Sequence, residues 1–261
     1  MTYNNFDVER TSGQGTIHLF YACVLLLTGL GLAVLYSSSY AFAARFFKNG
    51  NYFFVRQAVF AGIGIVFFFV FSHLNLEKLR KYIILLLLAA AVLCVLTLVP
   101  GIGVERLGAS RWIEIGSQTY QPSEMVKFVL LLYLAHIFDK KADNLDSFGS
   151  GVLPPVLITG IFFGLVYVQN NFSTAVFIVC NALVVFFLAG IRYRYFFSAI
   201  AIMIPVSALL VFTAEHRVRR LVSFIMPEWD PLGAGYQVRA SRLTIISGGL
   251  LGKGVGQGVR K

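Results

Sequence analysis

The sequence predicts an all-α fold, a bundle of transmembrane helices that crosses the bilayer several times. Of its 261 residues, 57% are hydrophobic and only 13% are charged, and the mean hydropathy of +0.76 is far above that of soluble domains. The apolar residues form about seven continuous runs rather than the alternating pattern of a transmembrane β-barrel. Because hydrocarbon holds no water for backbone groups, such runs are expected to be helices.

In chain order, each run is long enough to be read as a span of roughly 30 Å of hydrocarbon. The first is too long for a removed signal peptide and has no small-residue cleavage pattern. Pro154 and Pro155 suit the start of the fifth, and Pro205 is expected to kink the seventh. The predicted spans are residues 17–38, 52–71, 82–99, 123–138, 152–168, 174–191 and 195–214.

Three segments are therefore expected: a cytoplasmic N-terminal segment (1–16), a seven-span membrane domain (17–214) and the start of a large extracytoplasmic loop (215–261). The last segment ends while still polar, which predicts a fragment of a longer protein. Orientation follows from basic residues beside short loops, which mark the cytoplasmic side. These residues are Lys78, Arg80, Lys81, Lys140, Lys141, Arg192 and Arg194.

A candidate site lies on the opposite, extracytoplasmic side, in the polar segment from Gly108 to Lys127. Gln121, Pro122, Ser123 and Glu124 open the fourth span, and a carboxylate near a helix N-terminus is ordinary helix-start chemistry. That explanation does not cover Lys127, which shares a face with Glu124 and is costly in a membrane unless it is paired or hydrated. A functional polar face is the favoured interpretation.

Two neighbouring features have simpler interpretations as well. Trp112 is either an interfacial anchor or part of the site, and Arg111 either snorkels or presents a planar cation to phosphate oxygens. The polar turn Gln169–Thr174 between two spans is interpreted as structural, because Asn and Ser suit short turns.

Other chemistries find little support. The three cysteines lie within apolar runs, which predicts inert thiols, and the four histidines are too scattered for a metal cage. The glycine-rich run Gly248–Gly254 lacks the pattern of a phosphate loop. The net charge of +10 favours anionic lipid head groups or a diphosphate over nucleic acid.

Four landmarks occur in order along the chain: Leu98–Gly103, then Gly108–Ile113 with Gln121–Glu124 and Lys127, then residues 169–174, and finally Pro227, Asp230, Gly235–Gln237 and Ser247–Gly249. Together they resemble the SEDS (shape, elongation, division and sporulation) family of bacterial cell-wall proteins over nearly the whole chain. The landmark Leu98–Gly103 resembles the division member more than the elongation member.

The resemblance implies a peptidoglycan glycosyltransferase that polymerises lipid II outside the cytoplasmic membrane during septal wall synthesis. It implies as partners a class B penicillin-binding protein transpeptidase and other divisome membrane proteins. Members of the family have ten spans, so the last spans are expected to be missing here. The family's proposed general base, an aspartate before the eighth span, is expected beyond Lys261, which predicts that this chain alone is inactive.

In this chain, the resemblance makes Arg111 and Lys127 the expected contacts for a diphosphate or lipid head group, with Glu124 orienting them or closing a buried ion pair. The wider set of expected substrate contacts is Trp112, Gln121, Ser123, Arg217, Arg220, Gln237 and Lys253. The family also suggests magnesium or manganese, although no ligand set for either is visible. Asn170 and Asn171 replace the family's usual Pro-Asp, which removes a carboxylate.

Two alternatives to the glycosyltransferase stay open. The first is a lipid II flippase, which would require alternating access and whose usual sign, discontinuous helices or inverted repeats, is not visible. The second is a divisome scaffold without catalytic activity, which would recruit the transpeptidase through apolar helix faces.

Overall fold

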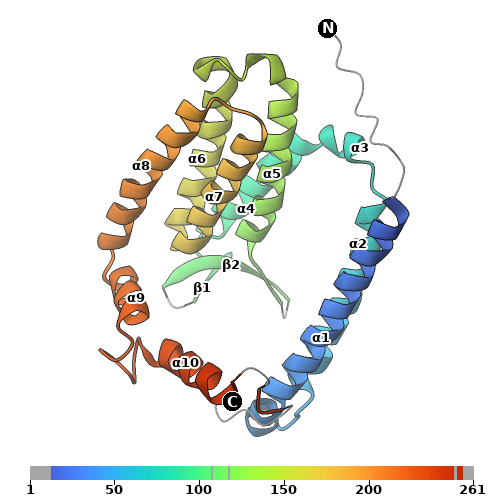
Figure 1. Cartoon of the computed structure of the whole chain (residues 1–261), viewed down its shortest axis with the longest axis vertical. Helices are drawn as coiled ribbons and strands as arrows, with labels where there is room; N and C mark the ends of the chain where they lie inside the picture. Colours follow the sequence, from blue (N-terminus) through green and yellow to red (C-terminus); the bar gives the residue numbers. More distant parts are fainter. Residues whose placement is uncertain (1–12, 107, 117, 250–251, 255–261) are drawn as a thin grey trace. The chain divides into compact units, whose positions relative to one another are not determined.

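The computed structural model describes residues 13–106, 108–116, 118–249 and 252–254, and it is mainly helical (Figure 1). Contacts divide the chain into two compact units, Met1–Leu74 with His216–Lys261, and Asn75–Glu215. The expected segment 1–16 lies mostly outside the described residues. The division into residues 1–16, 17–214 and 215–261 stays a prediction.

Every predicted span is largely helical. The seven helices are α1 (Gly13–Phe47), α2 (Tyr52–Ser72), α4 (Ile83–Leu96), α5 (Pro122–Lys140), α6 (Leu153–Val168), α7 (Phe172–Leu188) and α8 (Tyr193–Phe212). Four helical stretches of the described chain are long and apolar enough to cross a membrane: Gly15–Phe47, Tyr52–Ser72, Phe148–Val168 and Tyr193–Phe212. The prediction of a helical, polytopic membrane protein is confirmed, and the count of seven spans stays a prediction.

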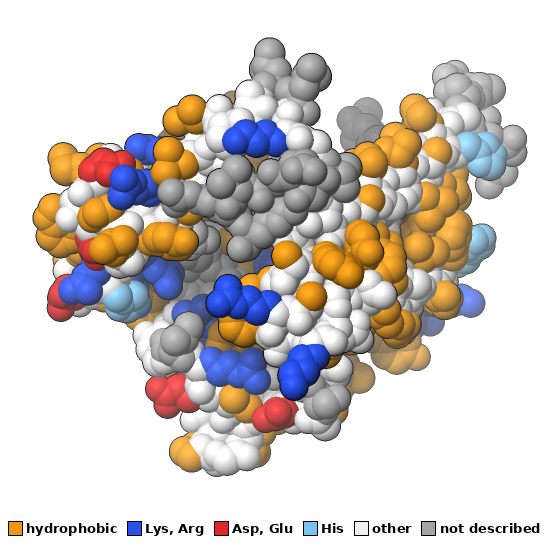
Figure 2. Space-filling view, turned by 90° about the horizontal axis from the view of Figure 1, so that it is seen from below, with side chains coloured by type: hydrophobic (Ala, Val, Ile, Leu, Met, Phe, Trp, Pro, Cys, Tyr) orange, Lys and Arg blue, Asp and Glu red, His pale blue; other side chains and the backbone are white. Residues whose placement is uncertain are grey.

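In the first unit, α1 and α2 pair through aromatic side chains. Tyr21 packs edge-on against Phe68 with ring centroids 5.5 Å apart, and Tyr36 packs in the same way against Phe54 at 5.4 Å. Such edge-to-face contacts stabilise the pair beyond the burial of area. Hydrophobic side chains form patches on the face shown in Figure 2, with Lys and Arg side chains between them.

The same unit contains most of the predicted extracytoplasmic loop, which is partly helical. It includes α9 (Glu215–Ile225) and α10 (Tyr236–Gly248). Before α10, the Asp230 carboxylate accepts hydrogen bonds from the backbone N–H groups of Gly233 and Ala234, both at 2.9 Å. These bonds fix the turn that leads into the helix, so the acidic landmark has a structural role.

The second unit is built around α4, α5, α6 and α7: α4 packs on α5 and α6, α7 packs on α5 and α6, α5 also packs on α6, and α8 packs on α7. Small residues such as Ala90, Cys94 and Ala175 are fully buried in this core, where they allow close approach of helices in a membrane. The larger side chains Leu134 and Ile178 fill the remaining space. A short helix, α3 (Leu76–Arg80), precedes α4, and a 3₁₀ turn (Ala142–Asn144) with a π-helix (Phe148–Val152) precedes α6.

One part of this unit was not predicted. The segment between α4 and α5, expected to be a loop, forms an antiparallel sheet in the order β1 (Gly103–Arg106), β2 (Ala109–Ile115), β3 (Gln118–Tyr120). Gly108 and Gly116 follow β1 and β2 with φ of 72° and 62°, a backbone region that glycine adopts without strain. The sheet lies at the ends of the helices, where β2 contacts α5 (Figure 1).

Candidate functional site

The end of α4, the sheet, the start of α5 and the turn between α6 and α7 meet at one end of the second unit (Figure 1). Polar side chains from these segments form hydrogen bonds with one another there. We call this region the polar end. Four hydrogen bonds join segments that are between 48 and 75 residues apart in the sequence. The Arg111 segment and the turn before α7 therefore lie at the same end of the bundle.

Arg111 lies on β2, and its Nη2 donates to the carbonyl oxygen of Asn170 at 2.6 Å. The guanidinium carbon also lies 5.7 Å from the ring centroid of Trp112. Both side chains are partly buried. The guanidinium of Arg111 is thus hydrogen-bonded to Asn170 at the polar end, which distinguishes it from a snorkelling arginine.

The turn between α6 and α7 connects the parts of the polar end. Gln169 is buried, and its Nε2 donates to the carbonyl oxygen of Cys94 at 3.0 Å, at the end of α4. Asn170 donates from its side chain to the Gly108 carbonyl at 2.8 Å. The turn is structural, as predicted from its composition, but it also determines where Arg111 lies. Sequence reasoning missed Asn170, for which the only signal was the departure from Pro-Asp.

Ser123 has no exposed surface, and its hydroxyl receives two amide donors. Gln121 Nε2 lies 3.0 Å from Ser123 Oγ, and Asn171 Nδ2 lies 3.3 Å from the same atom. Ser123 and Gln121 therefore brace the start of α5 rather than standing open to a substrate. An asparagine at position 171 donates this bond, whereas the family's carboxylate could only accept one.

Glu124 and Lys127 form an ion pair on the first turns of α5. Lys127 Nζ lies 2.7 Å from Glu124 Oε2, and their side chains are 23% and 52% exposed respectively. The expected pairing is present, but the pair is half exposed rather than buried. Lys127 Nζ also lies 5.5 Å from the ring centroid of Phe177 on α7, and this contact holds the cation over an aromatic face.

The four remaining candidates belong to the first unit. Arg217 and Arg220 lie on α9, Gln237 lies in the first turn of α10, and Lys253 follows that helix. Arg220, Gln237 and Lys253 are exposed, and Arg217 is partly buried. Their expected role, as substrate contacts together with Arg111, stays a prediction.

The magnesium or manganese suggested by the family resemblance stays a prediction. In the part of the chain that the structure describes, no three His, Cys, Asp or Glu side chains come together as possible ligands. Glu124, the carboxylate at the start of α5, is neutralised by Lys127. We therefore derive no step through a metal.

At the other end of the second unit, two of the basic residues that predicted the cytoplasmic side form ion pairs. Arg80 binds Asp139 at 2.5 Å and also donates from Nε to His136 Nδ1 at 3.2 Å. Arg192 binds Asp146 at 2.5 Å, and this guanidinium holds the pKa of the Asp146 carboxyl below its usual range. The first pair joins α3 to the last turn of α5, and the second joins the segments that precede α8 and α6. The orientation itself stays a prediction.

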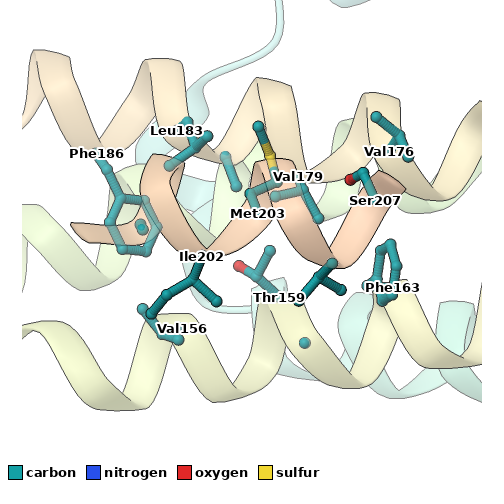
Figure 3. A pocket seen from close by; sticks show the side chains of 14 residues that line it. Val156, Thr159, Phe163, Val176, Val179, Leu183, Phe186, Ile202, Met203 and Ser207 are labelled. Atoms are coloured by element: carbon teal, nitrogen blue, oxygen red, sulfur yellow. The ribbon is translucent and has the colours of Figure 1, made fainter. Parts of the chain in front are cut away.

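A cavity of about 300 Å³ lies between α6, α7 and α8 (Figure 3). Its walls are aliphatic and aromatic apart from two hydroxyl groups, those of Thr159 and Ser207. The Thr159 hydroxyl already donates to the Pro155 carbonyl at 2.8 Å. Without a charged residue in its lining, this cavity has the wrong chemistry for a diphosphate, so the polar end is the better candidate site.

The family model described as "Cell cycle protein" (FtsW, RodA and SpoVE) matches residues 17–261. A "Probable peptidoglycan glycosyltransferase FtsW" from Geobacter sp. (strain M18) is 35% identical over 97% of this chain and 69% of its own length. A protein of the same name from Trichlorobacter lovleyi is 34% identical over 91% of this chain and 62% of its own length.

A solved structure described as "Structural coordination of polymerization and crosslinking by a peptidoglycan synthase complex" is also similar. It has a TM-score of 0.65 and 28% identity, and the match covers 87% of this chain and 65% of that chain. The chain thus spans about two thirds of the length of the proteins it matches. Sequence and structural matches agree with the resemblance drawn from the four landmarks, and the chain belongs to the FtsW, RodA and SpoVE family.

Proposed function

We propose that the protein is a peptidoglycan glycosyltransferase that polymerises lipid II during septal wall synthesis. The observation that carries this proposal is the presence of two held cations, Arg111 and Lys127, at one polar end of an otherwise apolar helix bundle. Family membership supports it, because the FtsW relatives are named as probable peptidoglycan glycosyltransferases.

In the proposed reaction, the 4-hydroxyl oxygen of an acceptor sugar attacks the anomeric carbon of the donor. A carbon–oxygen bond forms there, and the bond from that carbon to the diphosphate oxygen breaks. The diphosphate leaves with the electron pair, while the hydroxyl proton passes to a general base. We assign no residue of this chain as that base.

Arg111 and Lys127 would act on the leaving group. Negative charge grows on the diphosphate as the bond breaks, and cations already held in place stabilise it without reorganising. Arg111 offers a planar group suited to phosphate oxygens, whereas Lys127 offers a compact charge. Glu124 would keep Lys127 in position through the 2.7 Å ion pair.

The proposed partners are a class B penicillin-binding protein and other divisome membrane proteins, and the proposed location is the division septum. The structural match to a peptidoglycan synthase complex supports a synthase partner. With the N-terminus in the cytoplasm, the polar end would face outward, where the lipid II sugars are polymerised.

The test uses the complete protein with its transpeptidase partner in lipid vesicles that contain fluorescent lipid II. We expect Lys127→Ala to lower the rate of glycan formation at least about tenfold, because a transition-state cation is lost. Lys140→Ala removes an exposed lysine at the other end of α5 and is the matched control, with the rate expected to stay unchanged.

Equal rates for Lys127→Ala and the control would remove Lys127 from the site. Transfer of lipid II across the vesicle membrane without polymer would overturn the glycosyltransferase and favour the flippase. A vesicle assay with neither activity, together with intact recruitment of the transpeptidase, would favour the scaffold.

A further inference from the structure

We propose that Asn170 is a positioning residue for Arg111, which it holds in the orientation that meets an anionic group. The inference rests on the proposed function, since it takes the leaving diphosphate of lipid II as that group. Asn170 itself touches no reacting atom in this proposal and acts through Arg111.

Asn170 makes two hydrogen bonds to the start of β2, one to Gly108 just before the strand and one to Arg111 within it. The Asn170 carbonyl oxygen accepts from Arg111 Nη2 at 2.6 Å, and the Asn170 side-chain amide donates to the Gly108 carbonyl at 2.8 Å. Gly108 and Arg111 are three residues apart on the chain. The carbonyl bond orients the guanidinium, and the amide bond fixes the backbone that carries it.

The turn that carries Asn170 is itself anchored on both sides. Gln169 is 1% exposed and binds the Cys94 carbonyl, while Asn171 is 4% exposed and binds Ser123 Oγ. These two buried contacts fix the turn to α4 and to α5. The Asn170 carbonyl is therefore presented by a rigid support rather than by a free loop.

The backbone of Asn170 also explains why this residue type occurs here. Its φ is 57°, in the left-handed region, which is costly for most side chains but tolerated by asparagine. Asparagine thus supplies the tight turn, the carbonyl direction and the amide donor together. Glycine would keep the turn and lose the donor.

Holding Arg111 before the substrate arrives has a physical benefit. A free arginine side chain populates many rotamers, and a side chain that is ordered in advance does not lose this conformational entropy on binding. The structure thus assigns Asn170 an effect on the same step as Arg111, so the two effects should not be independent.

The experiment measures kcat and KM for lipid II polymerisation by the complete protein with its partner. Asn170→Gly keeps the left-handed turn and its carbonyl but deletes the bond to Gly108, and we expect kcat/KM to fall about three- to tenfold. Asn170→Asp, which cannot donate, is a second variant with the same expectation if glycine impairs folding. Asn144→Ala, an exposed asparagine at the opposite end, is the control and is expected to have no effect.

Arg111→Ala alone is expected to cost more than Asn170→Gly, and the double variant should match Arg111→Ala within about twofold. Hydrogen exchange of the Ala109–Ile113 amides should also become faster in Asn170→Gly. The positioning role would be overturned if the losses in kcat/KM of the two single variants multiplied in the double variant. It would also be overturned if the Asn170 variants were as active as the control. Neither result would contradict the glycosyltransferase. Full activity in Arg111→Ala would overturn this inference, while Lys127→Ala still tests the proposed function.

Discussion

Ser123 shows how a single residue can organise the polar end. Its hydroxyl is completely buried, yet it binds amide donors from Gln121 and from Asn171 in the turn before α7. A buried donor that loses its acceptor costs far more than an ordinary hydrogen bond contributes. The residue was predicted as a substrate contact, and its geometry is that of a brace between α5 and the turn before α7.

We expect Ser123→Ala to lower the free energy of unfolding by about 1–3 kcal/mol, because two amide groups would be left without their acceptor. Thermal unfolding in detergent measures this change. Ser198→Ala removes an exposed hydroxyl that binds only its own helix, at the Arg194 carbonyl, and should change stability by less than about 0.5 kcal/mol. Equal losses for the two variants would contradict the bracing role.

At the level of the elements, the helices could be predicted and the sheet could not. Uninterrupted apolar runs mark a membrane helix strongly, and every such run in this chain is largely helical. The three strands are seven residues or fewer, and two of them carry charged residues, so they show no clear alternation. At the candidate site, the ion pair of Glu124 with Lys127 could be predicted from helical spacing. The hydrogen bond from Arg111 to Asn170 could not, because it joins residues 59 apart in the sequence and depends on tertiary packing.

The corner between α4 and β1 depends on Gly103. A Cβ atom at this position would lie 1.9 Å from the carbonyl oxygen of Thr97, a backbone atom that cannot easily move. We expect Gly103→Ala to lower the free energy of unfolding by about 1–3 kcal/mol through overpacking. Thermal unfolding in detergent is the measurement.

Gly160 provides the matched control for that substitution. It lies in α6 beside the apolar cavity, where an added Cβ meets no atom within 4 Å. Alanine is a better helix former than glycine, so Gly160→Ala should raise stability by up to about 1 kcal/mol. A stable Gly103→Ala variant would show that the corner can relax.

At the scale of the whole molecule, the protein has a polar end and a basic, ion-paired end in its second unit, and the orientation prediction places them on opposite sides of the membrane. Thr119 in β3 and Asp143 in the 3₁₀ turn are exposed at these two ends. We expect an impermeant maleimide to label Thr119→Cys in intact cells lacking an outer membrane barrier, and Asp143→Cys only after permeabilisation.

The unaltered protein is the background for this labelling, because Cys94 is buried and Cys23 and Cys180 lie within apolar helices. The reverse pattern, with Asp143→Cys labelled first, would mean that the N-terminus is outside. It would also place Arg111 and Lys127 on the side without lipid II sugars.

The Cys94 carbonyl has a consequence for how the chain is made. It accepts from the Thr97 hydroxyl at 2.8 Å and from Gln169, which the ribosome adds 75 residues later. Membrane helices enter the bilayer one after another and then associate. The Cys94 carbonyl at the end of α4 therefore lacks its hydrogen bond from Gln169 until the hairpin of α6 and α7 has been inserted. Biogenesis thus has a built-in order, in which the polar end forms only after synthesis has passed Asn171.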